Sequence, residues 1–135
     1  MPFVLDASVA MSWCFEDEAD PRTDEVLDRL AGDEAHTPAL WTYEVANVLL
    51  IAERRGRLTE SQVICFIGLL EQLPILVDTA ISMNTLLASA KTHQLTAYDA
   101  AYLVLAERLG VPLATLDADL AAAATASGVP LLLRN

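Results

Sequence analysis

Four carboxylates stand in sequence surroundings that do not suit a charge. Asp6 follows the apolar run Phe3–Leu5, at the centre of F-V-L-D-A-S-V-A. The other three lie within T-Y-E-V-A-N-V, T-A-Y-D-A-A-Y and L-A-T-L-D-A-D-L, and they are Glu44, Asp99 and Asp117. Carboxylate oxygens are the ligands that Mg²⁺ and Mn²⁺ prefer, whereas zinc favours His and Cys. If the four lie close together, they favour an acidic pocket that binds a divalent cation, because without one they would repel each other.

Each acid also has a simpler explanation when it is considered alone. Asp6 and Asp117 each precede a predicted helix, where Asp commonly caps the N-terminus. Thr96 and Asp99 resemble a capping box. Glu44 could pair with Arg55. Asp119, two residues after Asp117, could be a helix cap or an auxiliary ligand.

The elements that must position these acids follow the pattern of an α/β domain, in which short apolar runs alternate with longer amphipathic ones. We expect a mainly parallel sheet with flanking helices. The predicted strands are Phe3–Leu5, Ala35–Thr37, Ile75–Val77, Leu113–Thr115 and Leu131–Leu133. The predicted helices are Ala7–Cys14, Arg22–Ala31, Ala39–Arg55, Glu60–Gln72, Ile81–His93, Tyr98–Leu109 and Asp119–Ala126.

Periodicity places the acids relative to these elements. In the helix from Ala39, the apolar stripe of Trp41, Val45, Val48 and Ala52 leaves Glu44 at the edge of the buried face, with Asn47 as its polar neighbour. The helix that carries Asp99 is apolar nearly all round, so we expect it to be buried. Asp6 and Asp117 follow strands, at the sheet edge where open α/β sheets bind ligands.

Length and composition exclude several classes of protein. The 135 residues fit one domain, 1–135, and the net charge of −11 argues against a simple DNA-binding module. No apolar run reaches the roughly 18 to 20 residues of a membrane span, and no secretory signal is visible. Cys14 and Cys65 lack metal-type spacing, and we expect two buried thiols in a cytoplasmic protein.

The motifs V-L-D-A-S-V, W-T-Y-E-V-A-N-V-L, A-Y-D-A-A-Y-L-V-L-A and A-T-L-D-A-D-L occur in this order over essentially the whole chain. In order and rough spacing, the chain resembles the PIN-domain ribonucleases, and more narrowly the VapC-type toxins of toxin–antitoxin modules. The resemblance implies a PIN fold, a three-layer sandwich with a central mainly parallel sheet. It also implies endoribonuclease activity, a homodimer, and a cognate VapB-like antitoxin whose tail covers the acidic pocket.

The resemblance carries the acidic quartet of the family onto Asp6, Glu44, Asp99 and Asp117, and its small polar companions onto Ser8, Asn47 and Thr115. We expect Asp6 and Asp99 to bind Mg²⁺ or Mn²⁺ directly, and Asp117 directly or through water. Glu44 would be a ligand or the base that positions the attacking water. Leu120 stands where the family often has an aromatic residue, which leaves the role of Asp119 open. His36 and His93 sit in contexts that do not suit catalysis.

Two other readings compete with a ribonuclease. A Mg²⁺-dependent phosphatase fits Asp6 at a strand end, but a second acid is expected where Ser8 stands. A partner-binding module without catalysis would use the acids only as helix caps. The basic cluster of Arg54, Arg55 and Arg57 could contact phosphate, form a dimer-edge salt bridge, or only complement a helix C-terminus.

Overall fold

Four parallel strands form the centre of the structure, a computed structural model that describes residues 1–133. They are β1 (Phe3–Leu5), β2 (Ala35–Pro38), β3 (Ile75–Asp78) and β4 (Leu113–Ala114), and they lie side by side in the order β3-β2-β1-β4. Parallel strands need helical crossovers, and the sequence supplies a helix-forming segment between each pair. The last two residues of the predicted domain, 134 and 135, lie outside the described residues.

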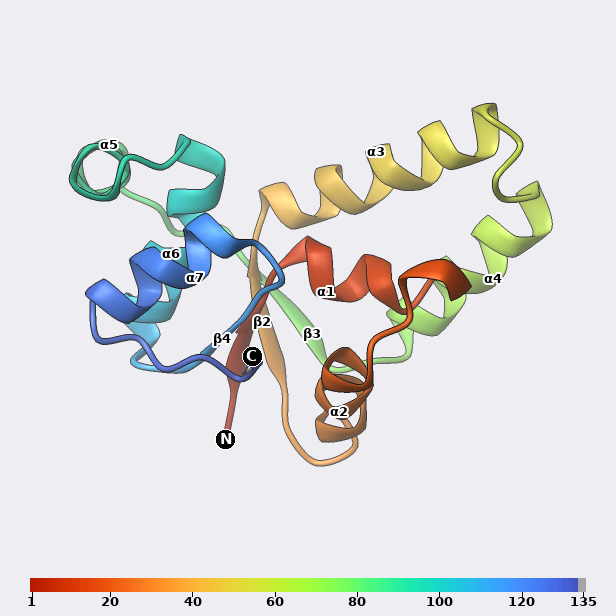
Figure 1. Cartoon of the computed structure of the whole chain (residues 1–135), viewed down its shortest axis with the longest axis horizontal. Coiled ribbons are helices and arrows are strands. Elements are labelled where there is room, and N and C mark those ends of the chain that lie inside the picture. The colour runs from red at the N-terminus through yellow and green to blue at the C-terminus, as the bar shows by residue number, and fades with distance from the viewer. Residues whose placement is uncertain (134–135) are drawn as a thin grey trace.

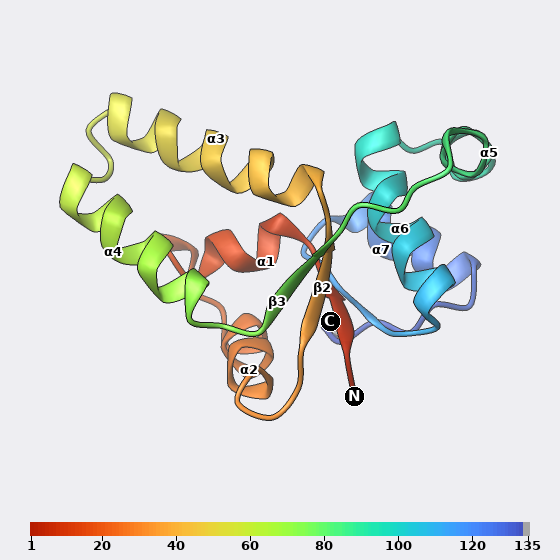
Figure 2. The same ribbon diagram turned by 180° about the vertical axis from the view of Figure 1, so that it is seen from behind.

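The helices cover the two faces of this sheet (Figure 1). One layer holds α1 (Ala7–Ser12), α2 (Pro21–Arg29), α3 (Leu40–Arg54) and α4 (Glu60–Glu71), with the short 3-10 helix η1 (Glu16–Glu18) between α1 and α2. The other layer holds α5 (Met83–His93), α6 (Ala97–Leu109) and α7 (Ala118–Ala126). The view from behind shows the same division, with α3 and α4 projecting away from the sheet (Figure 2). The predicted three-layer α/β architecture is confirmed.

The predicted strand Leu131–Leu133 is wrong as a strand. Leu131 forms only an isolated parallel bridge to Leu113. Two flanking backbone hydrogen bonds accompany it, from Leu113 N to Pro130 O and from Leu132 N to Leu113 O. The segment therefore lies beside β4 in the place of a fifth strand, but its pairing stops at this single bridge.

The core is built around β1, whose three residues are completely buried. A strand buried on both faces reads as a continuous apolar run, which is why Phe3–Leu5 was predictable. In α3 the buried stripe is Trp41, Val45, Leu49 and Ala52. The predicted stripe was wrong at Val48, which is partly exposed, because the helix faces the core one residue further round.

Capping residues in the sequence mark the start of α4 and the end of α6 where we expected them. Thr59 and Gln62 form a complete capping box at the start of α4. Gly110 ends α6 with φ at 67°, a left-handed conformation that glycine adopts without steric cost.

The expectation of two buried thiols was wrong, because Cys65 is exposed and Cys14 is half-buried. Within residues 1–133, no helix has the length and apolar character to span a bilayer.

Candidate active site

The register of β1 and β4 brings Asp6 and Thr115 together. Leu5 pairs with Ala114 in the parallel ladder, so the residues that follow each strand emerge at the same edge of the sheet. The ladder continues through the Asp6 N–H, which donates to Ala114 O at 3.0 Å. The first acid thus sits at the carboxyl end of the central strand, as the sequence predicted.

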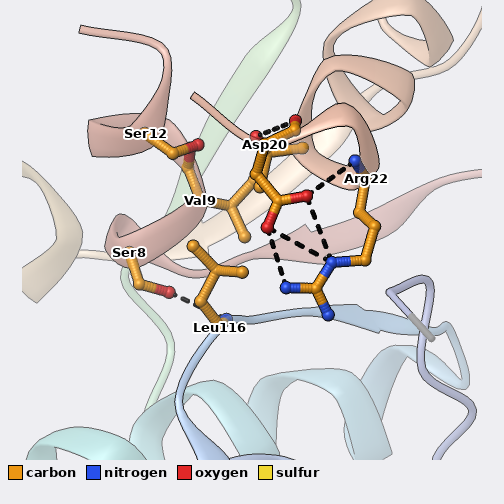
Figure 3. A network of polar contacts seen from close by, with 7 residues as sticks. Ser8, Val9, Ser12, Asp20, Arg22 and Leu116 are labelled. Atoms are coloured by element: carbon orange, nitrogen blue, oxygen red, sulfur yellow. Dashed lines mark hydrogen bonds and ion pairs between the residues drawn. The ribbon is translucent and has the colours of Figure 1, made fainter. Parts of the chain in front are cut away.

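Two hydroxyl groups hold one oxygen of the Asp6 carboxylate. Ser8 Oγ donates to Asp6 Oδ2 at 2.6 Å, and Thr115 Oγ1 donates to the same oxygen at 2.7 Å. The hydroxyls are in turn fixed by backbone donors, because Leu116 N–H donates to Ser8 and Asp117 N–H donates to Thr115. Figure 3 shows Ser8 of α1 facing the backbone of Leu116. This network fixes the orientation of a carboxylate that is only 6% exposed.

The same close view shows Asp20 and Arg22 at the start of α2, near the Ser8–Leu116 contact (Figure 3). The Arg22 guanidinium bonds both oxygens of Asp20, with Nη2 at 2.8 Å from Oδ2. Arg22 also lines a cavity of about 800 Å³ together with Thr115, Leu116 and Asp117. A basic group therefore lies at one border of the acidic site.

Burial opposes the charged form of Asp6. It raises the pKa of this carboxyl above its ordinary value, while the hydrogen bonds from Ser8 and Thr115 lower it and the charge of Asp117 raises it again. The hydroxyls thus favour the charged form of a carboxyl whose burial opposes it.

Glu44 reaches this region from α3, and its partner is a residue that the sequence did not single out. Tyr102 of α6 donates its hydroxyl to Glu44 Oε1 at 2.5 Å, and Tyr102 is completely buried. Burial raises the pKa of Glu44, the Tyr102 hydrogen bond lowers it, and the charges of Asp6 and Asp99 raise it. For Tyr102, burial and then Glu44 raise the phenol pKa, so the tyrosine remains a donor. The predicted alternative, a pair with Arg55, is not formed.

Asp99 approaches from the first turn of α6. Its pKa is raised by burial and by the charges of Asp117, Asp6 and Asp119, in decreasing order. The site therefore joins acids from β1, α3, α6 and the β4–α7 junction in one electrostatic neighbourhood. Asp119, on the exposed first turn of α7, acts on it through Asp99.

Helix capping, the simpler explanation for Asp6, Asp99 and Asp117, applies to only one of these acids. Asp117 does cap α7, since its Oδ1 accepts the Leu120 N–H at 2.8 Å. Asp6 makes no side-chain cap bond to α1, although it occupies the N-cap position. In α6 the cap is Thr96, whose hydroxyl accepts the Asp99 N–H, and within residues 1–133 no return bond from the Asp99 carboxylate completes a box. Helix capping accounts for Asp117 but not for the carboxylates of Asp6 and Asp99.

The side chains of Asn47, His36, His93 and Arg57 form no hydrogen bond or ion pair with the four acids within residues 1–133. Asn47 is exposed on α3, and its side chain forms no hydrogen bond within the described part of the chain. His36 contacts Glu34, and His93 contacts Ser127. Arg57 binds Asp17 and Glu18, and its guanidinium carbon lies 3.8 Å from the centre of the Phe15 ring. The phosphate contact considered for Arg57 is therefore not supported, because the side chain is used to hold η1.

The donor set suits Mg²⁺ or Mn²⁺ in its chemistry. Burial first, and then the charges of neighbouring acids, raise the pKa values of Asp6, Glu44 and Asp99. None of the basic side chains in residues 1–133 forms an ion pair with these three acids. In the conformation described for residues 1–133, no group of three or more His, Cys, Asp or Glu side chains is arranged to bind a metal ion. The acids thus fit a hard cation by kind and charge, and ligation would require their side chains to converge.

Comparison with protein-family models matches residues 3–126 to the PIN domain. This match covers nearly the whole sequence. The chain belongs to the PIN-domain family. Among curated proteins of this family, it is 35% identical to Ribonuclease VapC3 of Pyrobaculum aerophilum, over 90% of this chain and 93% of that protein.

Solved structures with the PIN-domain fold superpose on the chain despite low identity. The crystal structure of PAE2754 from Pyrobaculum aerophilum has a TM-score of 0.67 at 20% identity, covering 91% of this chain and 84% of that one. VapC20 of Mycobacterium tuberculosis, described as a Sarcin-Ricin loop cleaving toxin, has a TM-score of 0.62 at 13% identity, covering 98% and 99%. At these identities the likeness establishes the fold, and it agrees with the family resemblance expected from the four motifs.

Tyr102 is the site residue that sequence reasoning missed. The signal was present in A-Y-D-A-A-Y, where a tyrosine follows Asp99 by three residues on a helix that is apolar nearly all round. A buried phenol requires a hydrogen-bond partner, and an acid on another buried helix face is a suitable one. Only the folded structure, in which the Tyr102 hydroxyl of α6 reaches Glu44 of α3, reveals that this acid is Glu44.

Proposed function

We propose that this protein is a metal-dependent endoribonuclease that hydrolyses RNA phosphodiester bonds and acts as the toxin of a toxin–antitoxin pair. The observation that carries the proposal is the shared electrostatic environment of Asp6, Glu44 and Asp99, three acids from different elements whose pKa values are all raised. Membership of the PIN-domain family and 35% identity to a protein named Ribonuclease VapC3 support the same activity.

Asp6 and Asp99 are the proposed direct ligands of Mg²⁺ or Mn²⁺, with Asp117 as a ligand directly or through water. A divalent cation at this site would supply charge neutralisation for the scissile phosphate and lower the pKa of a bound water. The residues of the chain provide the rest: Ser8 and Thr115 orient Asp6, and Glu44 accepts a proton from the attacking water or takes a ligand position. Asp119 and Asn47 are proposed only as auxiliary groups at the border of the site.

An RNA substrate must approach a protein of net charge −11. Four of the arginines in residues 1–133 are engaged with acids, and they are Arg22, Arg29, Arg57 and Arg108. Arg54 and Arg55, at the exposed end of α3, form no ion pair within the described chain. We assign phosphate contact to these two, and we expect recognition by RNA shape and a few contacts rather than tight nonspecific binding.

The proposed partners are a VapB-like antitoxin and a second copy of this chain. Five large apolar side chains exposed on α3 and α4 support a protein partner, because a partner could cover them. They are Leu50, Ile51, Ile64, Ile67 and Leu69. Between the two helices lies a groove of about 320 Å³ lined by Trp41, Val45 and Leu70 among others.

The test is cleavage of a panel of structured and single-stranded RNAs by the purified protein, with Mg²⁺, with Mn²⁺ and with EDTA. Asp6→Asn removes the charge of the most buried acid and keeps its shape. The proposal expects metal-dependent cleavage that falls at least about 100-fold in this variant. Exposed Asp24 on α2 provides the matched control, since Asp24→Asn makes the same change away from the site and should cleave normally.

Two alternatives give different results in the same assay. Hydrolysis of small phosphomonoesters without cleavage of RNA would replace the ribonuclease with a phosphatase. If folded protein that binds the cation cleaves neither kind of substrate, the partner-binding reading stands instead.

A further inference from the structure

Tyr102 occupies a place in the site that the acidic quartet does not explain. It lies on α6, three residues after Asp99, so the two side chains share one face of this helix. Its phenol is completely buried, and its hydroxyl reaches across to an acid of α3. One helix therefore carries an acid of the site and the donor that holds a second acid from the opposite layer.

The contact is short and has a definite direction. The distance of 2.5 Å between Tyr102 Oη and Glu44 Oε1 is typical of a hydroxyl that donates to an ionised carboxylate. A tyrosine side chain has two rotatable angles and, when buried, little freedom to follow its partner. The contact thus restrains Oε1, and within residues 1–133 no hydrogen bond engages Oε2.

We propose that Tyr102 is a positioning residue for the reaction, whose hydroxyl holds Glu44 in the orientation in which Oε2 meets the divalent cation or its water. The inference rests on the proposed metal-dependent ribonuclease function, and it adds a residue outside the four acids. The hydroxyls of Ser8 and Thr115 do the same for Asp6. Each of these two acids would then have one oxygen held by hydroxyls and the other directed at the reaction.

If Tyr102 had only a structural role, its hydroxyl would contribute to stability through the hydrogen bond to Glu44 and would not affect the reaction. Tyr102→Phe separates the two roles, because it keeps the ring and removes only the donor. Tyr98→Phe is the control, since Tyr98 lies on the same helix, next to Asp99, with its side chain 68% exposed. The readouts are the Mn²⁺ dissociation constant of the RNA-free protein, measured by electron paramagnetic resonance, and kcat at saturating Mn²⁺.

We expect Tyr102→Phe to weaken Mn²⁺ binding or lower kcat by about tenfold or more, as removal of partners behind metal ligands commonly does. Tyr98→Phe should match the wild type in both. The effect of Tyr102→Phe should also disappear in a Glu44→Gln background, because the hydroxyl acts through that carboxylate. Thermal melting of each variant shows that the comparison is between folded proteins.

Two results would overturn the inference while the proposed function stands. One is a wild type that binds Mn²⁺ and cleaves RNA, beside a Tyr102→Phe variant that does both equally well and only melts at a lower temperature. The other is a loss of the same size in the wild-type and Glu44→Gln backgrounds. A wild type that neither binds Mn²⁺ nor cleaves RNA would instead refute the proposed function itself.

Discussion

Thr115 Oγ1 donates to Asp6 Oδ2 at 2.7 Å, although the two residues are 109 positions apart in the sequence. The contact is buried, and it joins the end of β4 to the end of β1. Because the same hydroxyl accepts the Asp117 N–H, it also connects two of the acids. The Thr115 hydroxyl thus links the backbone N–H of Asp117 to the carboxylate of Asp6.

Replacing Thr115 by Val removes this hydroxyl and preserves the shape of the side chain. We expect RNA cleavage to fall by about tenfold or more, because Asp6 loses a donor that orients it and lowers its pKa. The measurement is kcat/KM over a series of Mg²⁺ concentrations. Thr92→Val on exposed α5 serves as the control, and equal activity of the two variants would contradict the role of Thr115.

The metal-free protein should be less stable at neutral pH than at mildly acidic pH. The folded-state pKa values of Asp6, Glu44 and Asp99 are raised, so their contribution to the free energy of unfolding is full below the ordinary carboxyl values and is lost as pH rises through the raised ones. We therefore expect Mg²⁺ to raise Tm more at about pH 7.5 than at about pH 5. Melting curves at both pH values check this, and a Mg²⁺ effect of equal size would count against it.

Asp99→Asn should stabilise the metal-free protein while it abolishes activity. The substitution removes the charge that Asp117, Asp6 and Asp119 repel, and the Thr96 cap is unaffected because it uses the backbone of Asp99. We expect Tm to rise by up to about 5 °C without metal, and cleavage to fall at least about 100-fold. Asp24→Asn, in the first turn of α2, should produce neither change. A lower Tm for Asp99→Asn would show that the acids do not repel each other in the folded protein.

Substitutions of Arg57 and Arg54 should have different effects, the first on stability and the second on RNA cleavage. Arg57→Ala removes the ion pairs to Asp17 and Glu18 and the stacking on Phe15, so Tm should fall while kcat/KM for RNA stays within about twofold. Arg54→Ala should leave Tm unchanged and weaken RNA cleavage, more strongly at low salt. Cleavage kinetics at low and high salt, together with melting curves, test both variants. A reversed pattern would assign the phosphate contact to Arg57.

The sequence predicted the strands and helices that have strong periodic patterns. Phe3–Leu5 is a continuous apolar run, and such a run identifies a central parallel strand without tertiary information. The wrong strand, Leu131–Leu133, has the same local pattern. It forms only a single bridge to β4, so a local apolar pattern does not decide how far a segment pairs with its neighbour.

The candidate site was predictable to the level of residue type and less so to the level of contacts. Strand ends and first helical turns were expected to bring the four acids to one edge. Burial and then the charges of neighbouring acids raise the pKa values of Asp6, Glu44 and Asp99, which is consistent with this expectation. The partners of those acids were not predictable. Tyr102 and Glu44 are separated by 58 positions, and only the packing of α6 against the rest of the fold makes them neighbours.

The acids come from positions 6, 44, 99 and 117, and the carboxylate of the first is held by a hydroxyl that follows the last strand. No fragment that lacks β4 can assemble this arrangement, because Asp6 would lack the Thr115 bond and its ladder bond to Ala114. A ribosome making this protein would thus carry an inert chain until residues 113–117 leave the exit tunnel and join the sheet. A partner that binds the earlier helices has that interval in which to meet the chain before it can cut any RNA.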